Sequence, residues 1–288
     1  MANPEPLRTS LVQMSPGSDL WHNLRTAEVL ARRAIEADRP DLLSLPEMWS
    51  CLGGDTNAKL LAAEELPAPG SDEKAGPCYQ LLQNLAFASG TYIHGGSIGE
   101  RVGDHIFNTS LLFDDQGVEI ARYRKIHLFD VVTPDGDGYR ESALYGAGNQ
   151  VVTAKVRDLT VGLAICYDLR FPELFAELRR RGADLILLPA AFTMFTGKDH
   201  WEVLLRARAI ETQCWIAASA CWGKHIDGAG GARHTYGHSL IADPWGVVTA
   251  RASDGEGFVS GTIDPNLTAR IRTDMPVASH HRLPFPRA

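Results

Sequence analysis

Apolar residues occur along the chain in two alternating patterns. Short apolar runs bounded by proline, glycine or polar residues are typical of buried strands, whereas apolar residues three or four positions apart are typical of helices. The strand pattern covers residues 7–14, 41–45, 92–97, 159–166, 185–189 and 215–220. The helix pattern covers residues 20–37, 78–89, 172–181 and 201–213. Strands and helices that alternate in this way predict an α/β protein.

Other segments add hairpins to this pattern. Residues 108–114 and 118–125 predict a β-hairpin around the turn Asp115-Gln116-Gly117. The C-terminal part contains three further short strand patterns, at residues 239–243, 247–250 and 257–263. Alternating strands and helices combined with hairpins predict a layered sandwich with mixed sheets. No repeat, low-complexity tract or linker divides the chain, so we expect residues 1–288 to form one domain.

Two segments have the composition of loops. Residues 130–148 are rich in glycine, aspartate and proline and lack periodicity, which predicts an irregular loop. Residues 224–233 are glycine-rich, and they could form either a lid or part of the rim of a substrate entrance.

The overall charge and the cysteines exclude several classes of protein. The chain of 288 residues has a net charge of −7, which argues against binding to nucleic acid. No apolar stretch is long enough to span a membrane, and the N-terminus lacks a signal-peptide pattern. Five cysteines are an odd number without a CxxC pair, which favours a reducing, cytoplasmic location. No glycine-rich phosphate loop is present, so no cofactor is implied.

Three reactive side chains follow apolar strand patterns. Glu47 comes just after residues 41–45, Lys125 ends the run around residues 122–125, and Cys166 ends the run at residues 161–166. In open α/β folds the crevice lies beyond the carboxyl ends of strands. A carboxylate, an ammonium and a thiol could therefore meet in one crevice.

The segments around these residues are similar to the three signatures of the nitrilase-like carbon–nitrogen hydrolases. The motifs LPEMW, RKIHLFD and CYDLRFPEL stand in the order and at the separations of that family. The blocks HWEVLLRARAIETQC, YGHS and DPWG resemble the branch that hydrolyses deaminated glutathione and its relative, the ω-amidase branch. The resemblance implies a four-layer α-β-β-α sandwich and a homodimer or higher homo-oligomer. It also implies an amidase acting on a small molecule.

The resemblance assigns a role to each reactive residue. Cys166 would attack the amide carbonyl and form a thioester, which divides one hard step into two easier ones. Glu47 would be the base, with its pKa raised by burial toward about 6–7. Lys125 would stabilise the anionic oxygen, together with the backbone N–H of Tyr167. Glu141, in YRESALYGAG, would lie beside Lys125 and keep it charged.

Two further residues are candidates for substrate binding. Arg170 could hold a substrate carboxylate, with a salt bridge to Glu173 or Asp168 as the structural alternative. Thr196 could bind the same end of the substrate. Lys198 and Asp199 replace residues typical of the relatives, which leaves the shape of that pocket wall open.

Other functions remain as alternatives. His234 and His238 are four residues apart, but the intervening Thr-Tyr-Gly is a poor helix, so we expect no metal site. Arg208 and Glu211 are spaced to pair on a helix surface. Besides an amidase specific for deaminated glutathione, the catalytic set suits an ω-amidase or an N-carbamoyl-amino-acid hydrolase. A catalytically silent binding protein is the alternative from a different class.

Overall fold

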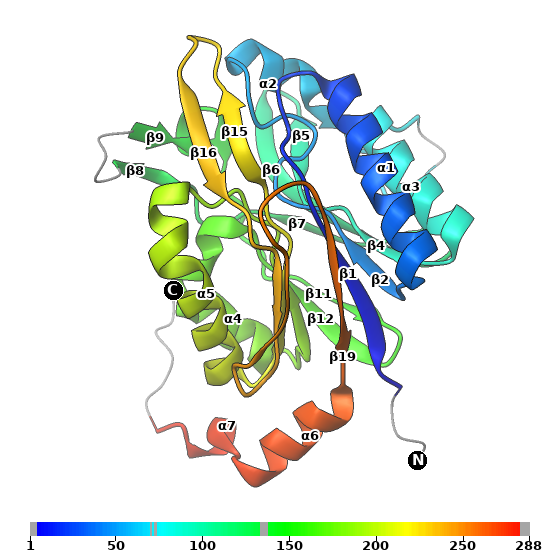
Figure 1. Ribbon diagram of the computed structural model, residues 1–288, viewed down its shortest axis with the longest axis vertical. Helices are drawn as coiled ribbons and strands as arrows, with labels where there is room; N and C mark the ends of the chain where they lie inside the picture. The colour runs from blue at the N-terminus through cyan, green and yellow to red at the C-terminus, as the bar shows by residue number, and fades with distance from the viewer. Residues whose placement is uncertain (1–4, 70, 72–73, 133–137, 283–288) are drawn as a thin grey trace.

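Two β-sheets pack face to face between two layers of helices (Figure 1). The computed structural model describes residues 5–69, 71, 74–132 and 138–282. Helices α1 (Leu20–Asp38) and α3 (Pro77–Ser89) cover the outer face of the first sheet. Helices α4 (Pro172–Arg180) and α5 (Met194–Thr212) cover the outer face of the second sheet. The predicted four-layer α-β-β-α sandwich with mixed sheets is confirmed.

The first sheet contains nine strands in the described residues, in the order β19-β1-β2-β4-β6-β5-β3, with β7 and β10 also paired to β6. Its β1, β2 and β4 are parallel neighbours, whereas β19, β5, β6 and β7 add antiparallel pairs. The bounds are β1 Leu7–Gln13, β2 Leu42–Ser44, β3 Glu64–Glu65, β4 Tyr92–His94, β5 Ile98–Val102, β6 His105–Phe113, β7 Glu119–Arg124, β10 Tyr145–Gly146 and β19 Gly257–Ile263.

The second sheet contains six strands of the described chain, in the order β11-β12-β13-β14-β17-β18. Its bounds are β11 Thr153–Val156, β12 Leu159–Leu163, β13 Leu185–Leu187, β14 Trp215–Ala218, β17 Leu240–Ala242 and β18 Val248–Arg251. Two separate hairpins complete the strands, namely β8 Asp130–Val132 with β9 Gly138–Arg140, and β15 Trp222–Ile226 with β16 Ala232–Tyr236.

The remaining helical segments are short. They are α2 Thr56–Ala62, α6 Pro265–Asp274, α7 Val277–His280, and the 3₁₀ turns η1 Glu141–Ala143 and η2 Cys166–Arg170. The side chain of Asp55 accepts a hydrogen bond from the N–H of Ala58 and so caps α2. None of the helices in the described part of the chain combines the length and the apolar character needed to cross a bilayer.

The structure corrects several of the predicted elements. Residues 130–148 are not an irregular loop throughout, because they contain β8, β9, η1 and β10; residues 133–137 lie outside the described residues. Residues 224–233 are a loop only in part, because residues 227–231 form the turn of the hairpin β15–β16 and the residues on either side lie in its strands. Helix α5 begins at Met194, seven residues before the expected start, and the side chain of Thr193 accepts a hydrogen bond from the N–H of Thr196 there. Helices α2 and α6 and strands β5 and β11 were not predicted.

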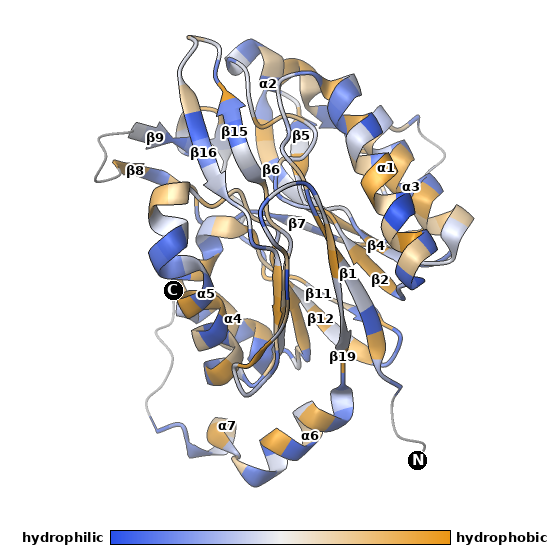
Figure 2. Ribbon diagram, in the orientation of Figure 1, coloured by the Kyte–Doolittle hydropathy of each residue, from blue (hydrophilic) through white to orange (hydrophobic). Residues whose placement is uncertain are grey.

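Strand β2 shows how one short segment separates two hydrophobic cores. Leu42 belongs to the core between the sheets, whereas Leu43 belongs to the core under α1 and α3. A strand that is buried on both faces reads as a continuous apolar run, which explains the pattern of residues 41–45. Figure 2 shows apolar residues concentrated on β2 and β12, while the hairpin β15–β16 is mostly polar.

A chain of polar side chains lies in the otherwise apolar space between the sheets. The hydroxyl of Ser219 donates to Ser44 Oγ at 2.6 Å. Ser44 Oγ lies 2.7 Å from His94 Nδ1, and the other ring nitrogen, Nε2, lies 2.8 Å from Ser110 Oγ. All four residues are fully buried. Burial lowers the pKa of His94 to about 3, so the ring is neutral in the folded protein.

We predict that His94 makes stability depend on pH. The unfolded chain binds a proton at His94 below about pH 6.5, and the folded chain does not until about pH 3. The free energy of unfolding therefore falls as the pH drops from about 6.5 toward 3, by up to about 1.4 kcal/mol per pH unit from this residue. His94→Gln keeps hydrogen-bonding groups but cannot titrate. The free energy of unfolding, measured by urea denaturation between about pH 4 and 6, should therefore depend less steeply on pH in this variant. The exposed His280→Gln is the control, and an equal slope in His94→Gln and wild type contradicts the prediction.

Candidate active site

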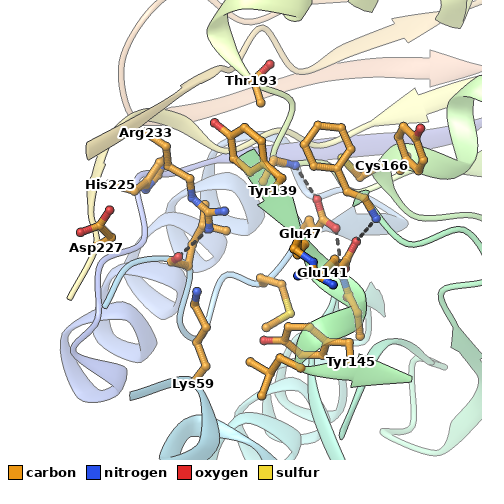
Figure 3. Close-up of a pocket in the computed structure, with 18 of the residues that line it drawn as sticks. Glu47, Lys59, Tyr139, Glu141, Tyr145, Cys166, Thr193, His225, Asp227 and Arg233 are labelled. Carbon is orange, nitrogen blue, oxygen red and sulfur yellow. Dashed lines mark hydrogen bonds between the residues drawn. The ribbon is translucent and has the colours of Figure 1, made fainter. Parts of the chain in front are cut away.

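The side chains of Glu47, Lys125 and Cys166 line one cavity of about 500 Å³ (Figure 3). Each lies within three residues of the end of a strand, β2, β7 or β12 respectively. They are 4%, 2% and 8% exposed. The predicted convergence of a carboxylate, an ammonium and a thiol is therefore what the structure contains.

The ammonium of Lys125 is surrounded by two carboxylates. Its Nζ donates to Glu47 Oε1 at 2.9 Å and to Glu141 Oε1 and Oε2 at 3.1 and 2.8 Å. Glu141 is held by the N–H of Phe129, which donates to its Oε2 at 2.7 Å. Burial alone would lower the pKa of Lys125, but the charges of Glu141 and Glu47 raise it well above its ordinary value. Lys125 is therefore a charged group in the interior.

Asn108 is a fourth polar member of this cluster that was not predicted. Its Nδ2 donates to Glu47 Oε1 at 2.9 Å and to Glu141 Oε1 at 3.1 Å, so it joins the two carboxylates. Asn108 lies in β6, and its carbonyl oxygen accepts from the N–H of Lys125 at 2.9 Å. The sequence did contain a signal for Asn108, because it is a polar residue in a buried strand and lies opposite the candidate residue Lys125 in the predicted hairpin.

Cys166 starts the turn η2 with a backbone φ of 43°, a conformation that is unfavourable for residues other than glycine. Its N–H donates to the carbonyl of Pro189 at 2.9 Å. Its thiol lines the same cavity as the carboxylate of Glu47, whose Oε2 accepts from the N–H of Ala191 at 2.8 Å. The next N–H, that of Tyr167, has no acceptor among the described residues. One free N–H beside the thiol is a suitable donor for an anionic oxygen.

The pKa of Glu47 shifts in the direction opposite to our expectation. Burial does raise it, but the charge of Lys125 and the hydrogen bonds from Lys125, Cys166 and Ala191 together lower the pKa below its ordinary value. Burial and the charge of Glu47 raise the pKa of Cys166 well above its ordinary value. The resting site thus contains a neutral thiol next to an ionised carboxylate.

Asp168 connects the turn of Cys166 to the segment that carries Lys125. Its Oδ2 accepts from the N–H of Ile165 at 2.8 Å and from the hydroxyl of Tyr123 at 2.7 Å. Its Oδ1 accepts from the backbone N–H of His127 at 3.1 Å and lies 2.7 Å from the ring Nδ1 of the same residue. Asp168 is fully buried, so it fixes the two segments relative to each other.

Arg170, Tyr167 and Thr196 also line the cavity. No carboxylate of the described residues lies within salt-bridge distance of Arg170; its guanidinium lies over the ring of Phe192 at 5.1 Å and 3.4 Å from His200 Nδ1. The alternative of a salt bridge to Glu173 or Asp168 is therefore wrong.

Three other sequence observations can be placed. Lys198 and Asp199 are exposed and do not line the cavity, so they do not shape its wall. Arg208 and Glu211 form the expected pair at 2.9 Å. Within the described ranges, no group of three or more His, Cys, Asp or Glu side chains is arranged to hold a metal ion.

Residues 8–273 match the family model of the carbon-nitrogen hydrolases, and the chain belongs to this family. The deaminated glutathione amidase of Synechocystis sp. is 40% identical over 279 residues, which are 96% of this chain and 98% of that protein. The deaminated glutathione amidase of Homo sapiens is 36% identical over 279 residues, which are 95% of this chain and 81% of that protein. The family predicted from the three motifs is thereby confirmed.

Solved structures agree with this assignment. Saccharomyces cerevisiae Nit3, a member of branch 10 of the nitrilase superfamily, has a TM-score of 0.85 and 29% identity and covers 98% of both chains. The C. elegans NitFhit protein has a TM-score of 0.85 and 34% identity, covering 98% of this chain and 66% of that one.

Proposed function

We propose that the protein is a thiol amidohydrolase that cleaves a linear amide of a small, carboxylate-bearing substrate through a thioester on Cys166. The specific substrate we propose is deaminated glutathione, with 2-oxoglutarate and cysteinylglycine as products. The observation that carries the proposal is the meeting of the Cys166 thiol, the Glu47 carboxylate and the buried Lys125 ammonium in one cavity. The likeness to amidases of that name supports the choice of substrate.

The first half of the reaction forms the thioester. As the sulfur of Cys166 attacks the carbonyl carbon, its proton passes to Glu47 and the carbonyl oxygen becomes anionic. Glu47 loses its charge at the moment when the oxyanion appears, so one N–H of Lys125 can turn from the carboxylate to the oxyanion. The N–H of Tyr167 is the second donor. Glu47 then gives its proton to the amine nitrogen, the carbon–nitrogen bond breaks and the amine leaves.

The second half releases the acid. A water molecule gives a proton to Glu47 and attacks the thioester, and the new oxyanion uses the same two donors. When the carbon–sulfur bond breaks, the thiolate of Cys166 recovers a proton from Glu47, and the carboxylic acid leaves. Glu141 and Asn108 do not take part in these proton transfers; they hold Lys125 and Glu47 in place.

The proposed substrate class follows from the walls of the cavity. Arg170 has no carboxylate partner among the described residues, so its guanidinium is available for a carboxylate on the acyl part of the substrate. Thr196 can add a hydrogen bond from its hydroxyl. A site with these groups accepts amides that carry an anionic end.

We predict that two substitutions separate the roles of thiol and base. Cys166→Ala should lower kcat by at least about 10³-fold, because no thioester can form. Glu47→Gln has the same shape but accepts no proton, so kcat should fall about 10²–10⁴-fold. Steady-state kinetics and intact-protein mass spectrometry of a trapped acyl adduct measure both effects. The buried Cys78→Ala, whose thiol does not line the cavity, is the matched control. Turnover retained by Cys166→Ala contradicts the mechanism.

We predict a substrate preference as well. The value of kcat/KM for deaminated glutathione should exceed that for 2-oxoglutaramate and for an N-carbamoyl amino acid by about tenfold or more, which corresponds to about 1.4 kcal/mol in the transition state. A side-by-side kinetic panel measures this preference. If 2-oxoglutaramate is hydrolysed as fast, the ω-amidase alternative holds. If none of the compounds is hydrolysed and all five cysteines react equally slowly with iodoacetamide, the silent binding protein holds.

We further propose that the chain folds as one domain. Pairing of β19 with the whole of β1 supports one domain over residues 1–288.

We also propose that the protein is a homodimer. Val203 and Ile210 on α5 are exposed and apolar, as is Trp245 on the adjoining turn, and such a patch is typical of an interface. Sedimentation equilibrium should give twice the mass of the chain for wild type. For Val203→Glu the measured mass should fall to that of a single chain. A monomeric wild type contradicts this.

We propose a cytoplasmic location, supported by five buried cysteines that are all free. Recovery of the protein outside the cytoplasmic fraction of the cell contradicts it. Small amides are its proposed partners, and neither nucleic acid nor membrane is among them.

A further inference from the structure

Two cationic side chains line the part of the cavity opposite Cys166. Lys59 comes from the last turn of α2, and Arg233 comes from β16. Figure 3 shows both side chains across the cavity from Cys166, with the ammonium of Lys59 directed toward the guanidinium of Arg233. Both residues are half-buried. The proposed mechanism uses neither of them.

Neither cation has a carboxylate within salt-bridge distance among the described residues. The charges of Asp227 and Asp55 act on Lys59, but both carboxylates are engaged elsewhere. Asp55 is engaged as the cap of α2, where its Oδ1 accepts from the N–H of Ala58 at 2.8 Å. Asp227 Oδ1 accepts from the N–H groups of Ala229 and Gly231 at the hairpin tip, at 2.9 and 2.8 Å. The two cations therefore face the cavity without a direct counterion.

The hairpin that carries Arg233 is fixed to the body of the protein. The N–H of Gly54 donates to the carbonyl of Ile226 at 2.8 Å, and Arg233 Nη2 donates to the carbonyl of Leu52. The ring of His225 is buried, with Nδ1 donating to the carbonyl of Pro16 at 2.8 Å. Of the two sequence alternatives, lid or rim, these contacts favour a fixed rim. A cation on a fixed rim is pre-organised for a ligand.

The placement of these charges is unfavourable while the cavity lacks an anion. Burial, and next the charge of Arg233, lower the pKa of Lys59 from its ordinary value. A ligand carboxylate between the two groups would offset the repulsion between Lys59 and Arg233. It would also accept charge-assisted hydrogen bonds from both.

We propose that Lys59 and Arg233 form an anion subsite for a carboxylate on the amine part of the substrate. This inference rests on the proposed function and adds the feature that selects the leaving group. Arg170 belongs to the same turn η2 as Cys166, and the Lys59–Arg233 pair lies across the cavity from Cys166 (Figure 3). An amide held at Cys166 with its acyl carboxylate at Arg170 would direct its amine part toward the pair. The site thus takes amides that carry a carboxylate on each side of the scissile bond.

The test compares two substrates that differ in one group. Deaminated glutathione ends in a glycine carboxylate, and its glycinamide analogue ends in a neutral carboxamide at the same position. Wild type should prefer the carboxylate by about tenfold in kcat/KM, the magnitude expected for charge-assisted hydrogen bonds at a half-buried site. Lys59→Met should reduce this ratio to within about twofold of one. Lys59→Glu should invert it, so that the carboxamide becomes the better substrate.

The ratio of the two kcat/KM values distinguishes a binding role from a structural one. A misfolded or weakened variant loses activity on both compounds, so its ratio stays the same as that of wild type. The matched control is Lys198→Met, which removes an exposed lysine that does not line the cavity, and its ratio should equal that of wild type. If wild type hydrolyses both compounds equally well, or if Lys59→Glu keeps the preference, the subsite is wrong and the proposed function stands. If wild type hydrolyses neither compound, deaminated glutathione is not the substrate, and the subsite is wrong together with that choice of substrate.

Discussion

The assembled site depends on burying one ammonium group. Lys125 is among the largest fully buried side chains, and an unpaired charge there would cost several kcal/mol. Glu47 and Glu141 supply opposite charges, and Asn108 hydrogen-bonds to both carboxylates. These partners come from segments far apart in the sequence, so Lys125 is satisfied only when the ends of β2 and β7, the strand β6 and the turn η1 are correctly placed relative to one another. The cluster that serves catalysis in our proposal is therefore also a constraint on the packing of the first sheet.

The second constraint is the backbone at Cys166. A residue other than glycine with a φ of 43° carries about 1–3 kcal/mol of strain, which the surroundings must offset. Asp168 does so from inside the same turn, because its carboxylate accepts from Ile165, from Tyr123 in β7 and from His127 just past the end of β7. The nucleophile turn is thereby tied to the segment of Lys125. Cys166 follows a strand of the second sheet and Lys125 follows a strand of the first, and this one buried carboxylate links the two segments.

Much of this arrangement could be predicted from strand ends, and the rest depends on register. Residues 41–45 and 159–166 are apolar runs that lead into Glu47 and Cys166, so local pattern was enough there. In the hairpin β6–β7, a bulge between Leu112 and Phe113 shifts the pairing by one residue. Lys125 then lies opposite Asn108, while Arg124 turns away to pair with Glu100 at 2.7 Å. No pattern of residue types reveals such a bulge, and it decides which of two adjacent cations enters the site. The direction of the pKa shift of Glu47 could not be predicted without knowing its partners, because burial raises the pKa and pairing with Lys125 lowers it.

The charge of the whole chain and the charge of the cavity also differ in sign where the substrate binds. The net charge is −7, which would repel a dianionic substrate at long range. Charges more than about 8–10 Å away are largely screened at physiological salt, so the nearest groups decide the local potential. Glu47 and Glu141 are neutralised in part by Lys125, whereas Arg170, Lys59 and Arg233 have no carboxylate at salt-bridge distance among the described residues. The cations free to bind thus outnumber the free acids inside the cavity. An anionic amide gains more from entering than a neutral one, and that difference is a physical basis for selecting substrates by charge at both ends.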